Sequence, residues 1–308
     1  MYRILVVGTV SNVASHLISD LKRLDESIGN FHKTEYFLVE SDSRDRTLDI
    51  LNDLGANRDG FRWKSLGSLA EFIPDRVERI RHCRNEYVNF IRENFNIHHW
   101  DFVVIADLDG MNKALSPSSF ASCFDRNDWD VCLSNQKGGY YDIFALRHPT
   151  WQPENYFNEL DLLRETLPRT SGLSIFIPKR FEISLREDRA KKIAIYKKMR
   201  KIPRGADWIS VDSGFGGFAV YRPDVFIRFN YDKITEDLRD SEHIDLHLKI
   251  IESGGKIYIN PNLINSNWNT YNINRFFIIR QLRRMMWNNS FVYDFYKKIK
   301  KLFSSHGS

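Results

Sequence analysis

The chain has 308 residues, of which 42% are hydrophobic and 14% aromatic, and its formal net charge is +5. This composition supplies enough apolar side chains for a packed core and excludes a chain that is disordered throughout. The length suits one large α/β domain, or one such domain with an appendage. The three cysteines, Cys83, Cys123 and Cys132, are too few and too scattered for a disulfide framework or a zinc site, which favours a reducing compartment.

Neither a signal peptide nor a membrane span is expected. The apolar stretch in MYRILVVGTV is too short for the hydrophobic region of a signal peptide and has no small-residue cleavage site after it. No apolar run is long enough to cross a bilayer. The sequence therefore predicts a cytoplasmic protein, which could also be peripheral at the cytosolic face of a membrane.

The first 110 residues alternate between two hydrophobic patterns. Short apolar runs predict strands at 3–10, 34–41 and 101–110, and amphipathic patterns predict helices at 12–28, 43–56 and 74–95. Gly55 is expected to end the second helix, and Pro74 to open the third. Strands that alternate with helices indicate a parallel, right-handed sheet that binds ligands at the carboxyl ends of its strands.

The pattern is looser after Gly110. Strands are predicted at 128–136 and 140–147, and a basic helical insertion at about 151–205. A strand then follows a glycine-rich loop, within 209–223, and after it come a helix at 241–255 and a strand at 256–264. Residues 272–303 have the pattern of an amphipathic helical tail.

The segment VVIADLDG ends an apolar strand with two aspartates. Alternate side chains of a strand share a face, so Asp107 and Asp109 are expected to project together, with Leu108 turned away. Two carboxylates this close repel each other unless a cation or strong hydrogen-bond donors lie between them. Mg²⁺ and Mn²⁺ commonly join such carboxylates to a diphosphate, so this D-x-D predicts a metal–nucleotide site. The alternative is a hydrogen-bonded turn.

Two further clusters contain candidate ligand contacts. In VESDSRDRTLDIL, Glu40 and Asp42 lie where a strand ends and could accept hydrogen bonds from a ribose or base, whereas Ser43 or Asp45 would cap the next helix. In RIRHCRNE (79–86), three arginines lie on one helix, and arginine forks suit phosphate oxygens. An exposed helix face is the alternative explanation for these arginines.

Five segments together make the chain resemble a GT-A glycosyltransferase, most of all the capsule-associated α-mannosyltransferase-like group. They are ESDSRDRT, RIRHCRN, DLDG, SGFGGFAVYR and SEHIDLHLKIIESGGKIYINPNLI, and they extend over about residues 3 to 265. The resemblance implies an α/β, Rossmann-like fold with a mostly parallel central sheet flanked by helices. It implies a glycosyltransferase domain over 1–271, with a nucleotide-binding half at 1–110 and an acceptor half at 111–271, followed by a basic tail at 272–308.

Carried over residue by residue, the resemblance makes Glu40 and Asp42 nucleoside contacts and Arg84 a contact of the donor. Asp107 would contact ribose or metal, and Asp109 would be the principal metal ligand and thereby catalytic. The cofactor implied is Mn²⁺ or Mg²⁺, and the donor a UDP- or GDP-sugar.

The later segments would hold the sugars. By the same resemblance, Gly216 and Gly217 let the backbone approach donor and acceptor, and Glu242 faces the acceptor with His243 and His247 beside it. In an inverting enzyme Glu242 would be the general base, whereas in a retaining enzyme it would only orient the acceptor.

One feature departs from the family. Its members often supply a late histidine to the metal, but this chain has NPNLINSNWN at that point. Asn265 or Asn267 could replace that histidine, His243 or His247 could reach over, or water could fill the position. The four-residue spacing of these two histidines could itself bind metal, but capping or packing is favoured over zinc, since no third histidine is near.

Trp208 and Asp212 flank the glycine-rich loop. They could hold a sugar ring by stacking and hydrogen bonding, and a core tryptophan is an equally good account of Trp208.

These observations predict a metal-dependent transferase that passes a sugar from a nucleotide-sugar to a glycan or lipid-linked acceptor in surface polysaccharide or glycoconjugate synthesis. A sugar-phosphate nucleotidyltransferase is the first alternative, but GTVSNVASHL lacks the glycine-rich, basic phosphate loop of such enzymes. A non-enzymatic RNA-binding protein is the second, and no RNA-binding signature is present, so no nucleic acid is expected as a partner. Aromatic residues interleaved with lysines in the tail predict contact with an anionic membrane surface through 291–301.

Overall fold

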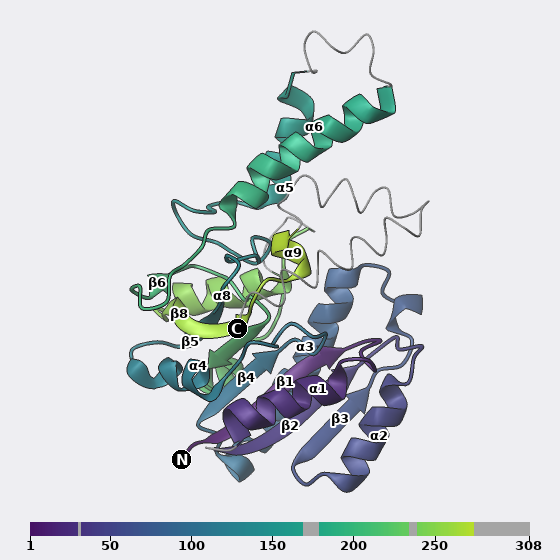
Figure 1. The fold of residues 1–308 in the computed structure, drawn as a ribbon. Coiled ribbons are helices and arrows are strands. Elements are labelled where there is room, and N and C mark those ends of the chain that lie inside the picture. Colours follow the sequence, from purple (N-terminus) through teal and green to yellow (C-terminus); the bar gives the residue numbers. More distant parts are fainter. Residues whose placement is uncertain (30–31, 169–178, 234–238, 274–308) are drawn as a thin grey trace.

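The computed structural model describes residues 1–29, 32–168, 179–233 and 239–273 (Figure 1). The predicted tail helix and its membrane-binding segment at 291–301 lie outside these residues, apart from the short helix α9 (Thr270–Ile273). Within the described residues, no helix has the length and apolar character needed to cross a membrane.

The described residues form a mixed sheet in the order β3-β2-β1-β4-β7-β5-β8-β6. The β1–β2, β1–β4, β2–β3 and β5–β8 pairs are parallel, whereas β7 runs antiparallel between β4 and β5, and β6 antiparallel to β8. The strands are β1 (Arg3–Val10), β2 (Lys33–Glu40), β3 (Phe61–Ser65), β4 (Phe102–Ala106), β5 (Val131–Gln136), β6 (Ile209–Ser210), β7 (Phe218–Tyr221) and β8 (Ile257–Ser266). The predicted α/β fold with a mostly parallel sheet flanked by helices is confirmed.

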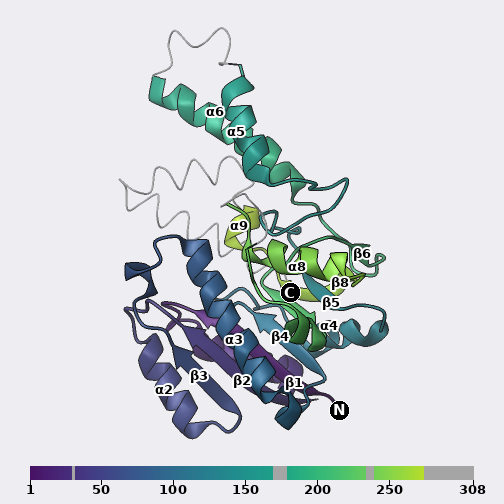
Figure 2. The same ribbon diagram turned by 180° about the vertical axis from the view of Figure 1, so that it is seen from behind.

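Helices cover both faces of the sheet, as Figures 1 and 2 show from opposite sides. They are α1 (Leu17–Leu24), α2 (Thr47–Asn57), α3 (Arg76–His98), α4 (Pro117–Ala121), α5 (Tyr156–Thr166), α6 (Lys179–Ala194), α7 (Asp224–Arg228) and α8 (Glu242–Glu252). A π-helical turn, Asp25–Gly29, extends α1, and Tyr196–Lys198 form a 3₁₀ turn after α6.

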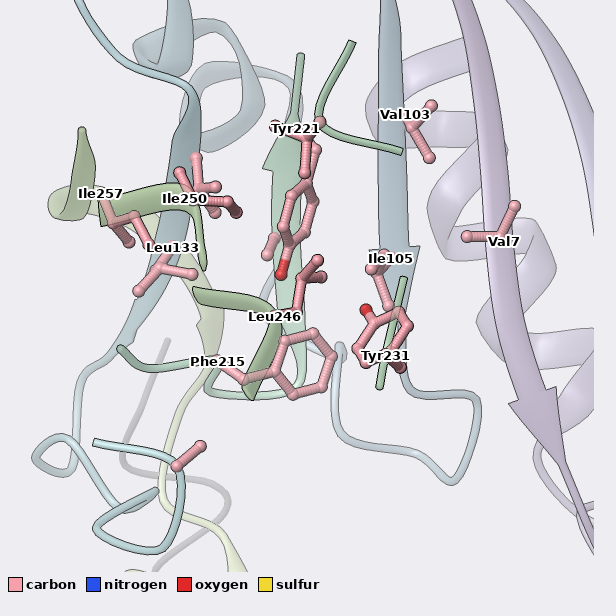
Figure 3. Close-up of a cluster of buried hydrophobic side chains, with 14 of the residues drawn as sticks. Val7, Val103, Ile105, Leu133, Phe215, Tyr221, Tyr231, Leu246, Ile250 and Ile257 are labelled. Atoms are coloured by element: carbon pink, nitrogen blue, oxygen red, sulfur yellow. The ribbon is translucent and has the colours of Figure 1, made fainter. Parts of the chain in front are cut away.

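Strand alternation divides the buried side chains between two cores. From β1, Ile4 and Val6 pack with α1 on one face, whereas Leu5 and Val7 join the core that contains α3 and α8 on the other. Figure 3 shows part of this second core, with Leu246 of α8 and Tyr221 of β7 among its buried side chains. Since β1 and β4 are buried on both faces, their sequences read as continuous apolar runs.

Three details of the predicted elements are wrong. β3 was not predicted, because it is a short edge strand of mostly exposed or half-buried residues and its apolar signal is weak. Gly55 does not end α2, which continues to Asn57. A Cβ at position 55 would lie 2.9 Å from Nε1 of Trp63, so the glycine permits α2 to pack closely on β3.

The predicted strand at 140–147 is also wrong. This segment forms turns, with a single bridge from Arg147 to Ser213. Its polar groups bond to loops instead of a neighbouring strand, because the Tyr140 hydroxyl accepts the N–H of Phe215 and Asp142 accepts the N–H of Ala145. Such local bonds compete with a strand ladder.

The insertion contains two helices where it is described, α5 and α6, as the helical pattern predicted. Helices α5 and α6 pack side by side and extend away from the sheet in both views (Figures 1 and 2). A small apolar cluster of Leu160, Ala190 and Ala194 joins them, and Arg164 forms an ion pair with Glu187 at 2.8 Å.

Candidate active site

A cavity of about 440 Å³ opens beyond the carboxyl end of β4. Its walls come from the turn after β4, the helix α3, the 140–147 segment, the glycine-rich loop, the start of α8 and the insertion. The residues that line it are Arg76, Ile80, Arg84, Asp107, Asp109, Met111, Tyr141, Asp142, Ile143, Phe144, Tyr156, Ile195, Tyr196, Met199, Phe215, Ser241, Glu242, His243 and Tyr271. Ligand-sized cavities that combine apolar walls with a few convergent polar groups are typical of active sites.

The D-x-D turn brings its two carboxylates to this cavity as expected. Asp107 and Asp109 line the cavity, whereas Leu108 is buried in the core that contains α1. The Asp107 N–H donates to the Gly217 carbonyl at 2.9 Å, and the Gly110 N–H donates to Oδ2 of Asp20 at 2.7 Å. These bonds fix the turn to β7 on one side and to α1 on the other.

Asp107 is electrostatically unusual. Burial, followed by the charge of Asp109, raises its pKa to about 8, although Arg84 opposes the shift. The carboxyl group is therefore mostly protonated at neutral pH while no cation is near. A divalent cation between the two carboxylates would reverse this preference, because it stabilises their charged forms.

The donor set suits a hard cation. Oxygen ligands are those that Mn²⁺ and Mg²⁺ prefer, and Mg²⁺ often takes one or two carboxylates and completes its shell with water and phosphate oxygens. Within the described residues, no group of three or more His, Cys, Asp or Glu side chains could hold a metal. Asp109 and Asp107 could hold such a cation, with water and substrate oxygens as its remaining ligands.

Arg84 and Glu242 form a buried ion pair in the cavity wall. Nε of Arg84 donates to Oε1 of Glu242 at 2.7 Å, and its Nη1 donates to the Tyr87 hydroxyl at 3.0 Å. Burial opposes the charge on Arg84, but Tyr87 and Glu242 outweigh it and raise the pKa of Arg84 well above its usual value. Arg84 therefore remains a fixed positive charge beside the acidic turn.

The glycine-rich loop lies against the D-x-D turn. Gly216 and Gly217 have φ values of 76° and 84°, which side chains disfavour. A Cβ on Gly217 would lie 3.4 Å from Oδ2 of Asp107 and 2.9 Å from Cγ of Met111. The loop thus approaches Asp107 as closely as it does because Gly217 lacks a side chain, whereas the absence of a side chain at Gly216 lets the loop pack on Ser134 and Gln136.

Asp142 is a cavity residue that sequence reasoning missed. Its Oδ2 accepts the Gly216 N–H at 2.9 Å, and burial raises its pKa. Asp142 therefore ties the 140–147 segment to the glycine-rich loop. The sequence predicted a strand at 140–147, and in a strand nothing would distinguish Asp142 as a residue of the site.

The insertion also contributes to the cavity, which the sequence did not indicate. Tyr156, Ile195, Tyr196 and Met199 are among the residues that line it. Tyr156 packs on Phe157 with ring centroids 4.3 Å apart and meets the edge of Phe144 at 6.3 Å. The cavity lining thus combines acidic side chains with aromatic and apolar ones.

Glu40 and Asp42 lie outside this set of lining residues. Glu40 is buried and accepts the Ser43 N–H at 2.9 Å and the Ser65 hydroxyl at 2.5 Å. Asp42 accepts the Ala70 N–H at 2.8 Å and lies 3.6 Å from Nε of Arg79. Both carboxylates thus shape loops at the end of β2, and a nucleoside contact for them remains a prediction.

Asp45 accepts a free N–H at the start of α2. The sequence predicted this role for either Asp45 or Ser43. Oδ1 of Asp45 accepts the Thr47 N–H at 2.9 Å. On α3, Arg81 is committed to Asp245 of α8 at 2.6 Å. Of the three arginines grouped in the sequence, only Arg84 is among the residues that line the cavity, and Arg76, about two turns earlier on α3, joins it there.

Trp208 and Asp212 also lie outside the cavity lining. Trp208 packs against Tyr258, with Arg126 over its ring at 5.4 Å, and a sugar contact for Trp208 or Asp212 remains a prediction. The Asp212 N–H donates to the Arg147 carbonyl at 2.9 Å.

The candidate late metal ligands differ in their surroundings. His247 is fully buried, and its ring nitrogens lie 3.0 Å from the Ser213 hydroxyl and 2.9 Å from the Tyr221 hydroxyl. Asn265 is buried too, and its side chain bonds to Asn112 and to the Gly216 carbonyl, both at 2.8 Å. Both side chains are thus committed to packing, whereas His243, one turn before His247 on α8, lines the cavity.

Comparisons with known proteins gave structural similarity only. No family model matches the chain, and no curated protein matches it. A mannosyltransferase from Pyrobaculum calidifontis, solved with GDP-Man and Mn²⁺, is 13% identical with a TM-score of 0.47, covering 94% of this chain and 65% of its own. TarS from S. aureus (residues 1–349) is 14% identical with a TM-score of 0.41, covering 83% of this chain and 57% of its own.

A third similar structure is glucosyl-3-phosphoglycerate synthase from Mycobacterium tuberculosis, in complex with Mn²⁺, UDP and phosphoglyceric acid. It is 12% identical with a TM-score of 0.37, and the alignment covers 86% of this chain and 67% of that one. At TM-scores below 0.5 these similarities assign no role to any residue here.

Proposed function

We propose that this chain is a metal-dependent glycosyltransferase that uses a nucleotide-sugar donor. The observation that carries the proposal is the cavity itself, where Asp107 and Asp109 meet Arg84, Glu242 and a close-packed glycine loop. A paired carboxylate turn at the end of a buried strand suits a cation that carries a diphosphate. The rest of the cavity, whose wall includes aromatic side chains, suits a saccharide.

Asp109 and Asp107 would hold Mn²⁺ or Mg²⁺, which when bound supplies positive charge for the leaving diphosphate. Arg84 adds a fixed positive charge on the same wall. An acceptor hydroxyl would then attack the anomeric carbon as the bond to the diphosphate breaks. Because Oε1 of Glu242 already accepts from Arg84, Glu242 acts on the acceptor mainly through its other oxygen, Oε2.

The acceptor is proposed to be a glycan or a lipid-linked saccharide. The insertion supplies Tyr156 and Tyr196 to the cavity wall, and aromatic faces pack well against the apolar faces of sugar rings. The helices of this insertion, α5 and α6, extend away from the sheet (Figure 1).

The rival function, nucleotidyl transfer, would need phosphate-binding backbone after β1. In that turn Asn12 has a φ of 55°, its N–H donates to the Ser43 hydroxyl, and its side chain accepts the Arg44 N–H at 2.8 Å. These bonds already occupy the turn, which favours the glycosyltransferase proposal.

The proposal is tested by a donor screen with the purified chain. UDP-, GDP- and dTDP-sugars are incubated with Mn²⁺ or Mg²⁺, and release of the nucleoside diphosphate is measured with and without a panel of saccharide acceptors. Metal-dependent release from one donor is expected. Release that produces pyrophosphate from a nucleoside triphosphate and a sugar phosphate would instead establish the nucleotidyltransferase.

A peripheral membrane contact through 291–301 belongs to the same proposal. The segment combines Phe291, Tyr293, Phe295 and Tyr296 with lysines, a composition suited to an anionic lipid surface. In flotation with anionic vesicles at low salt, the full chain should float and a chain ending at Asn289 should not. Equal behaviour of the two chains would place any membrane contact elsewhere.

A further inference from the structure

The side chain of His243 is polar, buried and without a partner. It is 2% exposed and lines the cavity, and within the described part of the chain no group forms a hydrogen bond with either of its ring nitrogens. Leaving a buried polar group unsatisfied costs about 1–3 kcal/mol. Such a group in a cavity wall indicates a ligand that supplies the missing bond.

His247 provides a comparison on the same helix. It is equally buried, one turn further along α8, yet both of its ring nitrogens have hydroxyl partners, from Ser213 and Tyr221. The fold therefore satisfies a buried histidine where the histidine serves packing alone. The difference between the two rings is that His243 borders the cavity.

The surroundings of His243 define the chemistry of its ligand. Burial, followed by the charge of Arg84, lowers the pKa of His243 well below its usual value, so the ring is neutral. A neutral imidazole does not attract phosphate by charge, but it offers one donor and one acceptor to a hydroxyl group. Oε1 of Glu242 lies 3.7 Å from Nε2, too far for a hydrogen bond, but its negative charge favours the tautomer with the proton on Nε2 and leaves Nδ1 as the acceptor.

The position of the ring points to the sugar of the donor. His243 stacks on Phe215 with centroids 4.1 Å apart, and Phe215 lies two residues before Gly217, whose carbonyl accepts the Asp107 N–H. Nε2 of His243 lies 3.7 Å from Oε1 of Glu242, which pairs with Arg84. A sugar attached to a diphosphate at Asp107 and Asp109 would enter the space between these groups.

We propose that His243 is a binding residue that accepts, through Nδ1, a hydrogen bond from a hydroxyl of the sugar on the nucleotide donor. The proposal rests on the proposed function and extends it by naming the residue that distinguishes a nucleotide-sugar from the bare nucleotide. Its contribution appears in the ratio of two affinities, for the nucleotide-sugar and for the nucleoside diphosphate of the same base.

Isothermal titration calorimetry with Mn²⁺ tests the proposal on the full chain. The probes are UDP-glucose, UDP-galactose and GDP-mannose, each beside UDP or GDP. His243→Phe keeps a flat ring for the Phe215 stack, His243→Asn keeps a polar atom near the Nδ1 position, and His243→Gln places one near Nε2. Thermal denaturation of each variant checks that it folds.

In His243→Phe and His243→Gln, the ratio of the affinity for the nucleotide-sugar to the affinity for the nucleoside diphosphate should fall about tenfold. A tenfold change corresponds to about one hydrogen bond to a buried group. His243→Asn should retain most of this ratio, and nucleotide affinity should stay within about twofold in all three. Unchanged nucleotide-sugar affinity in His243→Phe, or equal losses for sugar and nucleotide, would overturn the proposal. If the wild-type chain binds none of these compounds, the proposed function fails, and the role of His243 fails with it.

Discussion

Arg84 and Glu242, which are 158 positions apart in the sequence, form one buried ion pair at the cavity wall, with 2.7 Å between Nε and Oε1. Removing one partner of such a pair leaves an uncompensated buried charge, which costs about 3–5 kcal/mol. Glu242→Gln should therefore lower both the melting temperature and the turnover. Its turnover should fall further than the loss of folded protein explains, and circular dichroism melts beside kinetics would measure both effects.

A second substitution separates the two effects of this change. Replacing both partners, as Arg84→Met with Glu242→Leu, removes the buried charges together and should recover much of the lost stability. Activity should not return, since both residues are proposed to act in the site. A double variant as active as the wild type would make the pair purely structural.

Asp109→Ala should abolish metal-dependent turnover with little loss of stability, because Asp109 is an exposed residue whose charge raises the pKa of its neighbour Asp107. The same residue change at Asp53, exposed on α2, is the matched control and should leave activity unchanged. Mn²⁺ binding measured by calorimetry should weaken strongly in Asp109→Ala only. Full turnover in Asp109→Ala, or in wild-type chain treated with EDTA, would exclude the metal role.

The sequence predicted those parts of the site that depend on one local segment. The D-x-D turn follows from an apolar strand that ends at Ala106, and Ser241 precedes a periodic helix that begins at Glu242, where its hydroxyl accepts the His243 N–H. β1 was predicted at its observed bounds, because a strand buried on both faces gives a continuous apolar run.

The rest depends on contacts between distant segments. Nothing local to Arg84 indicates Glu242, and nothing local to Asp142 indicates that it accepts the Gly216 N–H. Nothing in the sequence distinguishes Tyr156 and Tyr196 from other aromatic residues of the insertion. They line the cavity only because the fold places the insertion beside it. Conversely, Trp208 lies close to the glycine loop in sequence but packs with Tyr258.

Asp107→Asn should trade activity for stability in a way that depends on pH. The pKa of Asp107, about 8 in the folded chain, lies above that of a free aspartate, so the folded state holds the proton more tightly. The stability gained from that proton is complete below about pH 4 and is lost as the pH rises toward 8. Asparagine stays neutral throughout and avoids the loss.

Without divalent cations, the melting temperature of Asp107→Asn should match that of the wild type near pH 4.5 and exceed it by at least about 2 °C near pH 8. Mn²⁺ should raise the melting temperature of the wild type more than that of the variant, and turnover of the variant should be lower. A difference that shrinks as the pH rises would contradict the raised pKa.

Gly217→Ala should damage the site through shape alone. The residue has a φ of 84°, and an added Cβ would lie 2.9 Å from Cγ of Met111 and 3.1 Å from the Tyr141 hydroxyl. Gly254 has a φ of 83° but no atom within 4 Å of an added Cβ, so Gly254→Ala measures the backbone strain without the contacts. That strain costs about 1–2 kcal/mol, and crowding at Gly217 adds about 1–3 kcal/mol.

Denaturant unfolding should therefore show the larger loss of stability for Gly217→Ala. At a temperature where both variants are folded, only Gly217→Ala should lose turnover, because the loop that supports Asp107 has moved. Equal stability and equal activity of the two variants would mean that the close approach of the loop to Asp107 is not needed.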